Sequence, residues 1–300
     1  MFDFKAVELS DKAVLSPFLE ENTYQNCDFS FSNIFCWQNK YHTSYALYEG
    51  CLFLRFTTSS QDNGYLMPLG RCPTKKVIER LIRHTQNIGE PLRLYAVYPS
   101  VFEKLDAAFP AQFMYCADPD LFDYIYKSED LIFLKGKKLQ PKRNHINKFR
   151  KTYDFEYLPI TSNIIPQCID LYDQWSANHD QIPGDKSLEE ERVAMLRAFE
   201  NFEALALKGG VIVVEGKIVA YSYGQQLTQD TFVVHAEKAL VDIQGSYAIM
   251  NQQFAAHECS SYAYVNREED LGLPSLRQAK LSYQPSILLE KGQAAYMIKI

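Results

Sequence analysis

The two halves of the chain are joined by the stretch Lys135-Gly-Lys-Lys-Leu-Gln-Pro-Lys-Arg-Asn-His-Ile-Asn-Lys-Phe-Arg-Lys151. It contains eight Lys or Arg among seventeen residues, and no Asp or Glu. The whole chain has a formal charge of −6, so the residues outside the stretch sum to −14 (−6 minus +8). This concentration of charge predicts either a docking site for a polyanion, such as RNA, phosphate or anionic lipid, or a solvated helix that links two domains.

The second part of this stretch has the pattern of an amphipathic helix. Pro141 suits the first helical position, where the N–H that proline lacks is not needed. Ile146, Phe149 and Tyr153 recur at the spacing of one helix face, which predicts a helix from Pro141 to about Tyr153. The candidate polyanion-binding residues of this segment are Lys142, Arg143 and Arg150.

Length and composition are those of a soluble globular protein. Three hundred residues predict about two domains, and 47% hydrophobic with 23% charged residues is enough for a large core. The N-terminal residues Met-Phe-Asp-Phe-Lys-Ala-Val-Glu lack the apolar segment of a signal peptide. The longest apolar runs, such as 211–214, are too short to span a membrane. We expect a cytoplasmic protein without a transmembrane anchor, with peripheral membrane contact left open.

The seven cysteines are odd in number and form no Cys-x-x-Cys motif. This pattern predicts free, buried thiols in a reducing compartment, not a disulfide framework or a zinc site. The cysteines are Cys27, Cys36, Cys51, Cys72, Cys116, Cys168 and Cys259.

The order of predicted elements is the same in the two halves. Each half has a strand, helices, three antiparallel strands, a helix, a strand, a helix and a closing strand pair. In the first half, residues 122–134 are expected to form two strand-like runs. In the second half, hairpin strands meet at Gly216, a strand covers 231–238 and a helix runs from Gly245 to about Glu258. The sequence therefore predicts an α/β (α+β) protein with two domains, 1–134 and 135–300, each with a mixed, mostly antiparallel sheet flanked by helices.

Three segments resemble one known family. They are the basic segment 142–151, the strand His235-Ala-Glu-Lys-Ala239, and Val265-Asn-Arg-Glu-Glu-Asp-Leu-Gly-Leu-Pro-Ser-Leu-Arg-Gln-Ala-Lys-Leu-Ser-Tyr283. Over most of its length the chain resembles the phosphatidylglycerol lysyltransferase C-terminal-domain family, which is related to the Fem-type transferases. The resemblance implies two tandem GNAT-like (acyl-CoA N-acyltransferase) domains and an enzyme that takes an aminoacyl group from aminoacyl-tRNA. Lysyltransferases also have a multi-span membrane region that this sequence lacks, so lysylation of a membrane lipid is not implied.

Acyl transfer needs a base for the acceptor and hydrogen-bond donors for the developing oxyanion. In the GNAT fold two middle strands diverge and expose backbone N–H groups, and here the resemblance implies strands 231–238 and 262–267. Strict alternation puts His235 and Glu237 on one face, and Tyr264 and Asn266 on one face of the partner strand. We expect Glu237 or His235 as the catalytic base, Asn266 as a catalytic positioning group and Tyr264 as a substrate-binding group. The alternative is a polar strand edge with a paired core histidine.

Three cations near the end of the chain are further candidates. Arg277 and Lys280 lie at i and i+3 of a predicted helix, with Arg267 upstream. Such cations can hold a donor phosphate or stabilise the tetrahedral intermediate, although many helix-surface cations are only solvated. The resemblance makes Lys280 the strongest catalytic candidate, with Arg267 and Arg277 as substrate-binding residues. The acidic run 268–270 is typical of helix capping, so no metal site is expected.

A helix start that could bind CoA lies in the segment Asp242-Ile-Gln-Gly-Ser-Tyr-Ala248. Its cofactor-binding candidates are Gly245 and Ala248, but the repeated glycines of CoA-binding turns are missing and Asp242 adds a negative charge. An aminoacyl-tRNA donor would require no cofactor, whereas acyl-CoA remains possible.

These observations favour aminoacyl-tRNA-dependent transfer to an amine or hydroxyl of a small molecule, a lipid head group or a peptide. The basic helix would bind the acceptor end of the tRNA, and the second domain would carry out the transfer. The alternatives are a CoA-dependent N-acyltransferase and a non-catalytic module that binds RNA or anionic surfaces.

Overall fold

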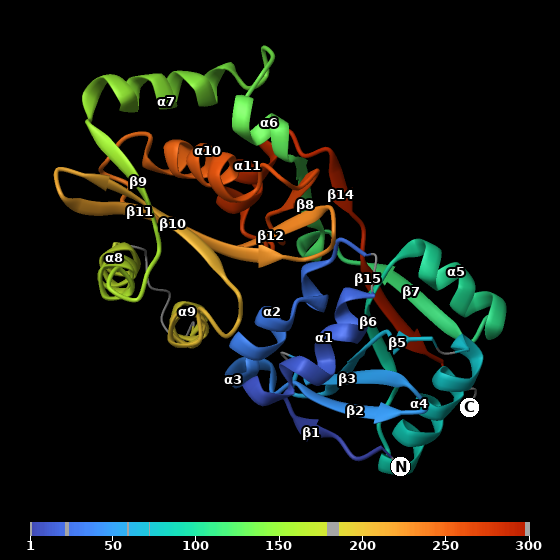
Figure 1. The fold of residues 1–300 in the computed structure, drawn as a ribbon. Helices are drawn as coiled ribbons and strands as arrows, with labels where there is room; N and C mark the ends of the chain where they lie inside the picture. Colours follow the sequence, from blue (N-terminus) through green and yellow to red (C-terminus); the bar gives the residue numbers. More distant parts are fainter. Residues whose placement is uncertain (1, 22–23, 59, 72, 179–185, 298–300) are drawn as a thin grey trace. The chain divides into compact units, whose positions relative to one another are not determined.

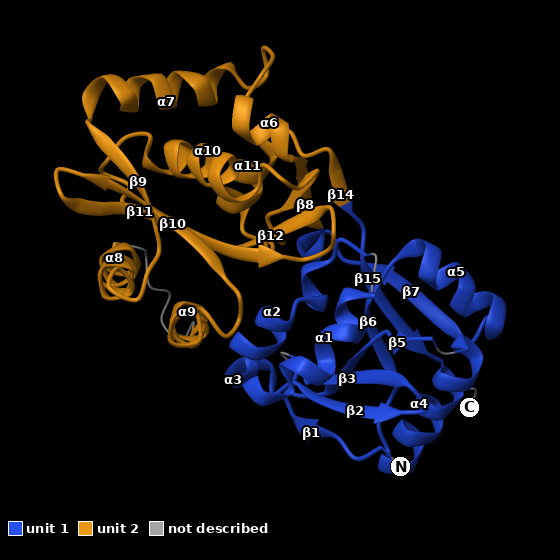
Figure 2. Ribbon diagram, viewed as in Figure 1, with its two compact units in different colours: residues 1–122, 289–300 blue, residues 123–288 orange. Residues whose placement is uncertain are grey.

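The computed structural model describes residues 2–21, 24–58, 60–71, 73–178 and 186–297 of the chain. These residues form two compact units, coloured separately in Figure 2. The first unit comprises residues 1–122 and 289–300, and the second comprises residues 123–288. Each unit contains one mixed β-sheet flanked by helices, which confirms the predicted architecture.

The first unit is built on a sheet with the strand order β1-β2-β3-β4-β6-β15-β7, and β5 also pairs with β3. The neighbours β4 and β6 are parallel. The strands are β1 (Lys5–Ala6), β2 (Ser44–Tyr48), β3 (Cys51–Thr57), β4 (Asn63–Leu66), β5 (Leu69–Gly70), β6 (Arg93–Val97), β7 (Phe113–Ala117) and β15 (Gly292–Tyr296). The helices are α1 (Lys12–Glu20), α2 (Phe31–Cys36), α3 (Gln38–Tyr41), α4 (Thr74–Ile88) and α5 (Pro99–Ala108).

The second unit has the strand order β14-β8-β13-β12-β11-β10-β9, in which β12 and β13 are parallel. The strands are β8 (Asp123–Lys127), β9 (Phe155–Pro159), β10 (Lys208–Val214), β11 (Lys217–Gln226), β12 (Thr231–Ala239), β13 (Tyr264–Asn266) and β14 (Ile287–Leu289). The helices are α6 (Ser128–Phe133), α7 (Gln140–Thr152), α8 (Ile165–Ala177), α9 (Ser187–Glu200), α10 (Ser246–Glu258) and α11 (Pro274–Leu281).

Helices cover both faces of the second sheet. Figure 1 shows α7 and α10 on one face and α8 and α9 on the other. On the α10 face, Phe232 and Val265 of the sheet belong to the same buried cluster as Phe254 of α10 and Phe149 of α7. These apolar contacts remove large aromatic surfaces from water and hold α7 and α10 against the strands.

The strands β8 and β15 do not belong to the sheets that the predicted domain boundary assigns them to. After β7 the chain leaves the first sheet, and β8 pairs with β13 and β14 in the second. After β14 the chain returns, and β15 pairs between β6 and β7 of the first sheet. The first unit is therefore completed by a strand from the end of the chain, and β8 belongs to the second unit, so the division differs from the predicted boundary at 134/135.

The predicted strand pair at 122–134 is wrong in its second half. Residues 123–127 form β8, but residues 128–133 form the helix α6. Ser128 and Leu131 are the buried residues of this short helix. The segment is too short for periodicity to separate a helix turn from a strand.

Two cysteines differ from the prediction of buried, free thiols. Cys27, Cys36, Cys168 and Cys259 are free and buried, but Cys116 is exposed. Cys51 is disulfide-bonded. Cys72 lies outside the described residues. The cysteine pattern therefore gives no evidence for a reducing compartment.

No helix among the described residues combines the length and the hydropathy needed to cross a membrane.

Candidate active site

The parallel strands β12 and β13 separate soon after they begin to pair. Their last paired residues are Val233 and Asn266, whereas β12 continues along β11 to Ala239. The register between β11 and β12 shifts next to Gly224, so that His235 is skipped in the pairing. An extra residue of this kind is a β-bulge, which bends the strand and redirects its side chains.

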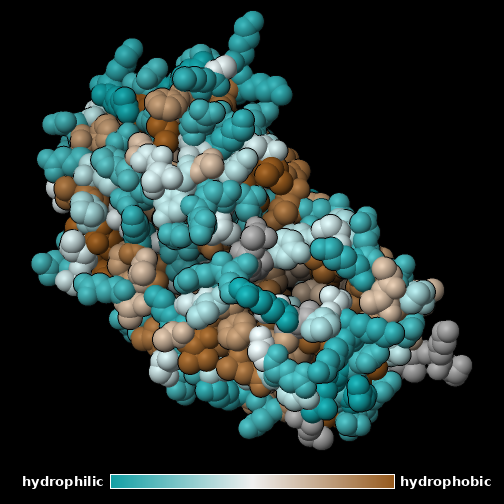
Figure 3. Space-filling view, turned by 45° about the vertical axis from the view of Figure 1, so that its right-hand side comes forward, coloured by the Kyte–Doolittle hydropathy of each residue, from teal (hydrophilic) through white to brown (hydrophobic). Residues whose placement is uncertain are grey.

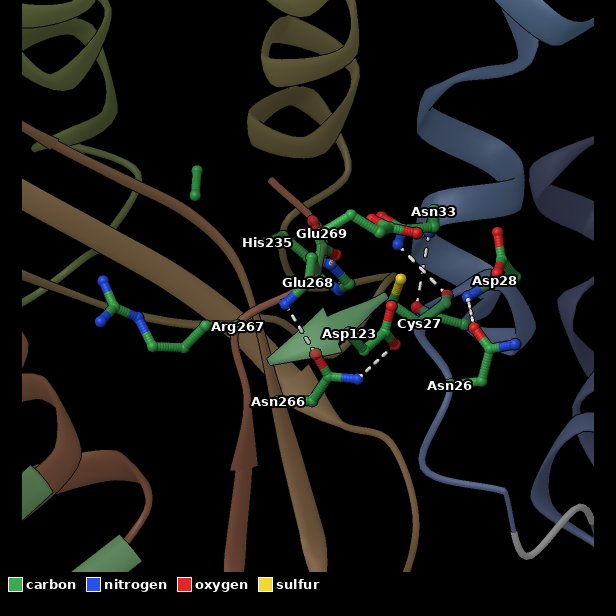
Figure 4. Close-up of polar contacts among 12 residues, drawn as sticks. Asn26, Cys27, Asp28, Asn33, Asp123, His235, Asn266, Arg267, Glu268 and Glu269 are labelled. Atoms are coloured by element: carbon green, nitrogen blue, oxygen red, sulfur yellow. Dashed lines mark hydrogen bonds and ion pairs between the residues drawn. The ribbon is translucent and has the colours of Figure 1, made fainter. Parts of the chain in front are cut away.

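The bulge puts His235 and Glu237 on opposite faces of the sheet. Glu237 accepts a hydrogen bond from Asn251 of α10, whereas His235 pairs with Glu268. Figure 4 shows that Arg267, the partner of Glu237, extends away from His235 and Glu268. The prediction that His235 and Glu237 share a face is therefore wrong, because the bulge adds a residue and reverses the alternation after it.

His235 and Glu268 form a nearly buried pair at the end of β13. Nδ1 of His235 lies 2.9 Å from Oε1 of Glu268, and the two side chains are 7% and 19% exposed. The other ring nitrogen, Nε2, is buried and has no hydrogen-bond partner among the described residues. A neutral imidazole that donates its Nδ1 proton to Glu268 presents a lone pair at Nε2. This is the arrangement of a general base that is oriented by a carboxylate.

A second polar cluster lies on the α10 face, around Glu237. Nη2 of Arg267 donates to its Oε1 at 3.2 Å, and Nδ2 of Asn251 donates to its Oε2 at 3.1 Å. The Arg267 guanidinium and the Nζ of Lys142 lie 5.0 and 4.0 Å from the centroid of the Tyr283 ring. Burial, and then the charge of Arg267, lower the pKa of Lys142. Burial alone would also lower the pKa of Arg267, but the Glu237 carboxylate raises it above its ordinary value.

Lys280 is buried and contacts the backbone. Its Nζ donates to the carbonyl oxygen of Arg267 at 2.6 Å and also to that of Glu269. The Tyr126 hydroxyl donates to the carbonyl oxygen of Lys280 at 2.8 Å. Burial, followed by the charge of Arg267, lowers the pKa of Lys280 to about 8. These contacts fix the backbone that carries Arg267 and Glu268.

Asn266 also supports that backbone, whereas Tyr264 lies at the other end of β13. Oδ1 of Asn266 accepts from the backbone N–H of Glu268 at 2.6 Å, and its Nδ2 donates to Asp123 of β8 at 2.7 Å (Figure 4). Tyr264 pairs with Thr231, where the two strands begin to run together. Asn266 therefore holds the backbone of Glu268, and Tyr264 is separated from the polar pairs by the length of β13.

Arg277 supports the loop between β13 and α11. Its Nε and Nη2 donate to the two carboxylate oxygens of Asp270 at 2.8 and 2.7 Å. The fully buried Asp270 also accepts from the Tyr124 hydroxyl at 2.5 Å and from the backbone N–H of Gly272 at 2.9 Å. Burial alone would raise the pKa of Asp270, but the hydrogen bonds from Arg277 and Tyr124 lower it.

The predicted basic helix is confirmed as α7, with Ile146 and Phe149 buried. Its three candidate cations contact different partners. Lys142 lies in the cluster around Glu237, Arg143 donates to backbone carbonyls including Gly136 in the turn before α7, and Arg150 donates to Gln252 of α10. Figure 3 shows hydrophilic residues over α7 at the top of the view. The exposed cations are Lys135, Lys137, Lys138, Lys148, Arg150 and Lys151.

Gly245 allows α7 to approach the start of α10. Its φ is +93°, and a Cβ at this position would lie 3.0 Å from the carbonyl oxygen of His145 and 3.2 Å from Cβ of Phe149. The backbone of α7 at His145 closes the space beside this turn, and Ala248 is buried. The packing of α7 therefore does not fit a pyrophosphate of CoA beside Gly245, the place where a helix start would bind it.

Sequence reasoning missed Glu268 and Asn251. Glu268 belongs to the acidic run that was interpreted as helix capping, and because its φ is +58° and it follows the end of β13, strand alternation could not predict where its side chain points. Asn251 is a polar residue among the buried residues Met250 and Phe254 of α10. A polar side chain within an apolar helix stripe indicates a buried partner, and that signal was present in the sequence.

Comparisons with known proteins agree with the resemblance found in the sequence. The family described as "Phosphatidylglycerol lysyltransferase, C-terminal" matches residues 21–296. A conserved protein of unknown function from Bacteroides thetaiotaomicron is 42% identical, with a TM-score of 0.93, over 99% of this chain and 100% of that chain. The structure of L-PGS from Bacillus licheniformis is 17% identical, with a TM-score of 0.63, over 95% and 91% of the two chains.

Two further matches extend this comparison. FemX is 7% identical, with a TM-score of 0.61, over 99% of this chain and 97% of that chain, and so shares the fold. An uncharacterized protein from Mycoplasmoides gallisepticum is 25% identical over 183 residues, which are 59% of this chain. The chain spans only 56% of the length of that curated relative.

Proposed function

Since the chain belongs to the phosphatidylglycerol lysyltransferase C-terminal family, whose name describes an acyl-transfer activity, we propose that it is an aminoacyltransferase that uses aminoacyl-tRNA. In this proposal the aminoacyl group passes from the tRNA to an amine or hydroxyl of an acceptor molecule. The acceptor could come from the small-molecule, lipid or peptide classes, which share that chemistry. A cytoplasmic location would give the protein access to charged tRNA.

The His235–Glu268 pair is the observation that carries this proposal. It lies where β12 and β13 stop pairing, and Nε2 of His235 is buried without a partner among the described residues. An acyl acceptor must lose a proton as it attacks, and a positioned histidine is the most common base for that step. Glu268, at 2.9 Å from Nδ1, would orient the ring and stabilise the imidazolium that forms.

The transfer would then proceed without a covalent enzyme intermediate. His235 takes the proton from the acceptor amine or hydroxyl while the acceptor forms a new bond to the ester carbonyl carbon. The tetrahedral intermediate collapses, the carbon–oxygen bond to the ribose of the tRNA breaks, and the ribose oxygen takes the proton from His235. Positively charged and N–H groups near the carbonyl oxygen stabilise the negative charge of the intermediate.

The donor is more consistent with tRNA than with acyl-CoA. The exposed cations of α7 and of the preceding turn offer several phosphate contacts, and such contacts make RNA binding strongly salt-dependent. The start of α10, in contrast, does not fit a pyrophosphate. We therefore expect the protein to bind charged tRNA and to have no saturable affinity for acetyl-CoA.

The test uses bulk tRNA charged with labelled amino acids. The full-length protein is incubated with this tRNA and with small-molecule, lipid and peptide fractions as acceptors. Transfer of the label from tRNA to one acceptor fraction is expected, and acetyl-CoA should not replace the tRNA. His235→Asn should lower the transfer rate by about 10²- to 10⁴-fold, the usual contribution of general-base catalysis.

His257→Asn is the matched control. His257 lies exposed at the end of α10, where it stacks on Tyr157 with a centroid distance of 4.1 Å, so the control should keep the wild-type rate. The proposal fails if wild-type protein transfers no label from tRNA to any fraction. It also fails, in its mechanism, if His235→Asn and His257→Asn transfer at the same rate.

A further inference from the structure

Two buried polar side chains of the first unit lie against each other, and each has an atom without a hydrogen-bond partner. The hydroxyl of Tyr65 on β4 and Nε2 of His84 on α4 have no partner among the described residues, and the two residues are 1% and 5% exposed. Their ring centroids are 6.4 Å apart, with one ring edge-on to the other. Buried polar groups in folded proteins are almost always paired, so two unpaired groups in one place indicate a group that is bound there.

Both side chains can donate a proton to that group. The backbone N–H of Phe2 donates to Nδ1 of His84 at 3.4 Å, so the neutral ring carries its own proton at Nε2. Burial lowers the pKa of His84, which keeps the ring neutral. Burial also raises the pKa of Tyr65 to about 12, which keeps the hydroxyl protonated. The bound group must therefore present an acceptor to Nε2, and the hydroxyl can donate to the same group.

Arg55 of β3 supplies a positive charge beside the pair. It lies directly opposite Tyr65 in the pairing of β3 with β4, so the two side chains share a face of the sheet. Its Nε donates to the Ser44 hydroxyl at 3.1 Å, and its guanidinium lies 4.6 Å from the centroid of the Phe4 ring. Arg55 is half-buried and forms no ion pair with a carboxylate of the described residues. A guanidinium in this setting favours an anion as the bound group.

The carboxylate of Glu90 does not cancel this charge. Its two oxygens accept from Nδ2 of Asn63 at 2.9 and 2.8 Å. Burial is the main cause of the lowered pKa of His84, and the charges of Arg55 and Arg80 lower it further. The charge of Glu90 acts against these two cations. Positive charge is therefore in excess around the His84 ring.

The other neighbours of the pair are aromatic. The centroid of the Phe2 ring lies 5.3 Å from that of His84 and 4.3 Å from that of Phe53. The Phe4 ring lies 6.1 Å from the Tyr65 ring. Aromatic walls of this kind suit the apolar part of an organic acid, and they disfavour a strongly hydrated phosphate.

We propose that the first unit binds the carboxylate of a small organic acid. Arg55, Tyr65 and His84 donate to its oxygens, and the aromatic side chains surround its apolar part. This inference does not rest on the proposed function, because His235 and Glu268 belong to the second unit.

The first test measures binding of monocarboxylates to the full-length protein by ligand-observed NMR. The probes are acetate, propionate, benzoate and phenylacetate, each paired with its amide, which has nearly the same shape and no charge. Wild-type protein should bind at least one acid about tenfold or more tightly than its amide, because hydrogen bonds to a charged acceptor are the stronger ones. Inorganic phosphate should bind more weakly than that acid.

Three outcomes of this test would overturn the inference. They are equal binding of every acid and its amide, no binding of any acid at millimolar concentrations, and tighter binding of phosphate than of all the acids. The first two would leave ordered water as the partner of the Tyr65 hydroxyl, and the third would assign the group to a different class of anion.

The variant Tyr65→Phe locates the bound acid, because it removes the unpaired hydroxyl and keeps the ring. Affinity for the selected acid should fall about tenfold, the usual effect of losing one hydrogen bond to a charged group. Tyr95→Phe is the matched control. Tyr95 follows Leu94, the partner of Tyr65, so its side chain lies on the other face of the sheet, where its ring contacts Phe56 at 5.1 Å. Equal affinities of the two variants would place the acid elsewhere and overturn the site.

The variant Arg55→Gln tests the origin of the preference for an anion. It should bind the selected acid and its amide alike, because the positive charge is gone. Arg83→Gln, which changes an exposed arginine of α4, is the control and should keep the wild-type preference. A preference for the acid that survives Arg55→Gln would contradict the role of Arg55. Thermal unfolding of each variant without ligand checks that it is folded.

Discussion

Lys280 is a buried cation whose partners are neutral. Its ammonium donates to backbone carbonyls, of which that of Arg267 is at 2.6 Å, and no carboxylate lies within ion-pair distance among the described residues. Burial, followed by the charge of Arg267, therefore lowers its pKa to about 8. The residue positions the backbone between Arg267 and Glu268, so we expect it to act through them and not on the substrate directly.

This lowered pKa predicts how stability depends on pH. In the unfolded chain the pKa of Lys280 returns to its ordinary value near 10.5, so between about pH 8 and pH 10.5 the unfolded state binds the proton and the folded state does not. The cost of burying the charge is therefore present below pH 8 and is relieved as the pH rises through that window. The free energy of unfolding of wild type minus that of Lys280→Met should increase by on the order of 1 to 3 kcal/mol from pH 7 to pH 10.

Urea unfolding of the two proteins at both pH values provides the measurement. Taking the difference between wild type and variant removes the contribution of the other titrating groups. A difference that stays constant from pH 7 to pH 10 would show that Lys280 keeps its ordinary pKa in the folded protein.

At the scale of elements, the packing of α7 on α10 brings the basic segment to the site. Gly245 begins α10 with φ +93°, and its missing Cβ leaves room for the backbone of α7 at His145. Lys148 of α7 donates to Gln244 at 2.6 Å, just before that glycine. Lys142 of the same helix lies in the cluster around Glu237.

Replacing Gly245 by alanine should therefore destabilise the protein more than an equivalent change elsewhere. Gly136 has a similar φ of +89°, but a Cβ there would meet nothing within 4 Å. Gly136→Ala should cost about 1 to 2 kcal/mol, the strain of a left-handed conformation. Gly245→Ala should cost at least about 1 kcal/mol more, because α7 must also move. Urea unfolding compares the two, and equal losses would contradict the close packing of α7.

At the scale of the whole molecule, each sheet contains an interior strand, β15 in the first and β8 in the second, that pairs with strands far away in the chain. Among the described residues, β15 is the strand that connects β7 to the rest of the first sheet, and β8 connects β14 to the second. Tyr124, Ile125 and Tyr126 of β8 are buried in the second unit. Cutting the chain between its two apparent halves therefore removes a central strand.

Fragment stability tests the structural role of β8. The fragment 123–288 contains every strand of the second sheet except the last residue of β14, and it should unfold cooperatively in urea. The fragment 135–300 lacks β8 and α6, and it should not unfold cooperatively. The fragment 128–288 keeps α6 and lacks only β8, so it isolates the strand. Cooperative unfolding of 128–288 with the stability of 123–288 would contradict the structural role of β8.

Many of the elements that carry the candidate site could be predicted from the sequence, because they depend on local patterns of residues. The hairpin at Gly216, the helix 140–152 with its stripe of Ile146 and Phe149, and the helix that starts after Gly245 are all as predicted within a few residues. His235, Glu237 and Arg267 of the two polar clusters were also among the predicted site residues. Turn glycines and helical periodicity depend on neighbouring residues alone, so one sequence is enough to reveal them.

What each candidate residue does was decided by the tertiary structure. The bulge at His235 puts this residue and Glu237 on opposite faces of the sheet. The sequence of β12 alone does not reveal the bulge, because the extra residue exists only in the pairing of β12 with β11. Lys280 binds a backbone carbonyl after β13. Its sequence neighbours could not show this, because the residues that bury it and accept its hydrogen bonds belong to other elements. The sequence by itself determined most of the elements and the family, and it indicated candidate residues for the site. Pairing between distant strands decided the domain boundary and the faces that these residues occupy, since such pairing depends on contacts that local patterns do not encode.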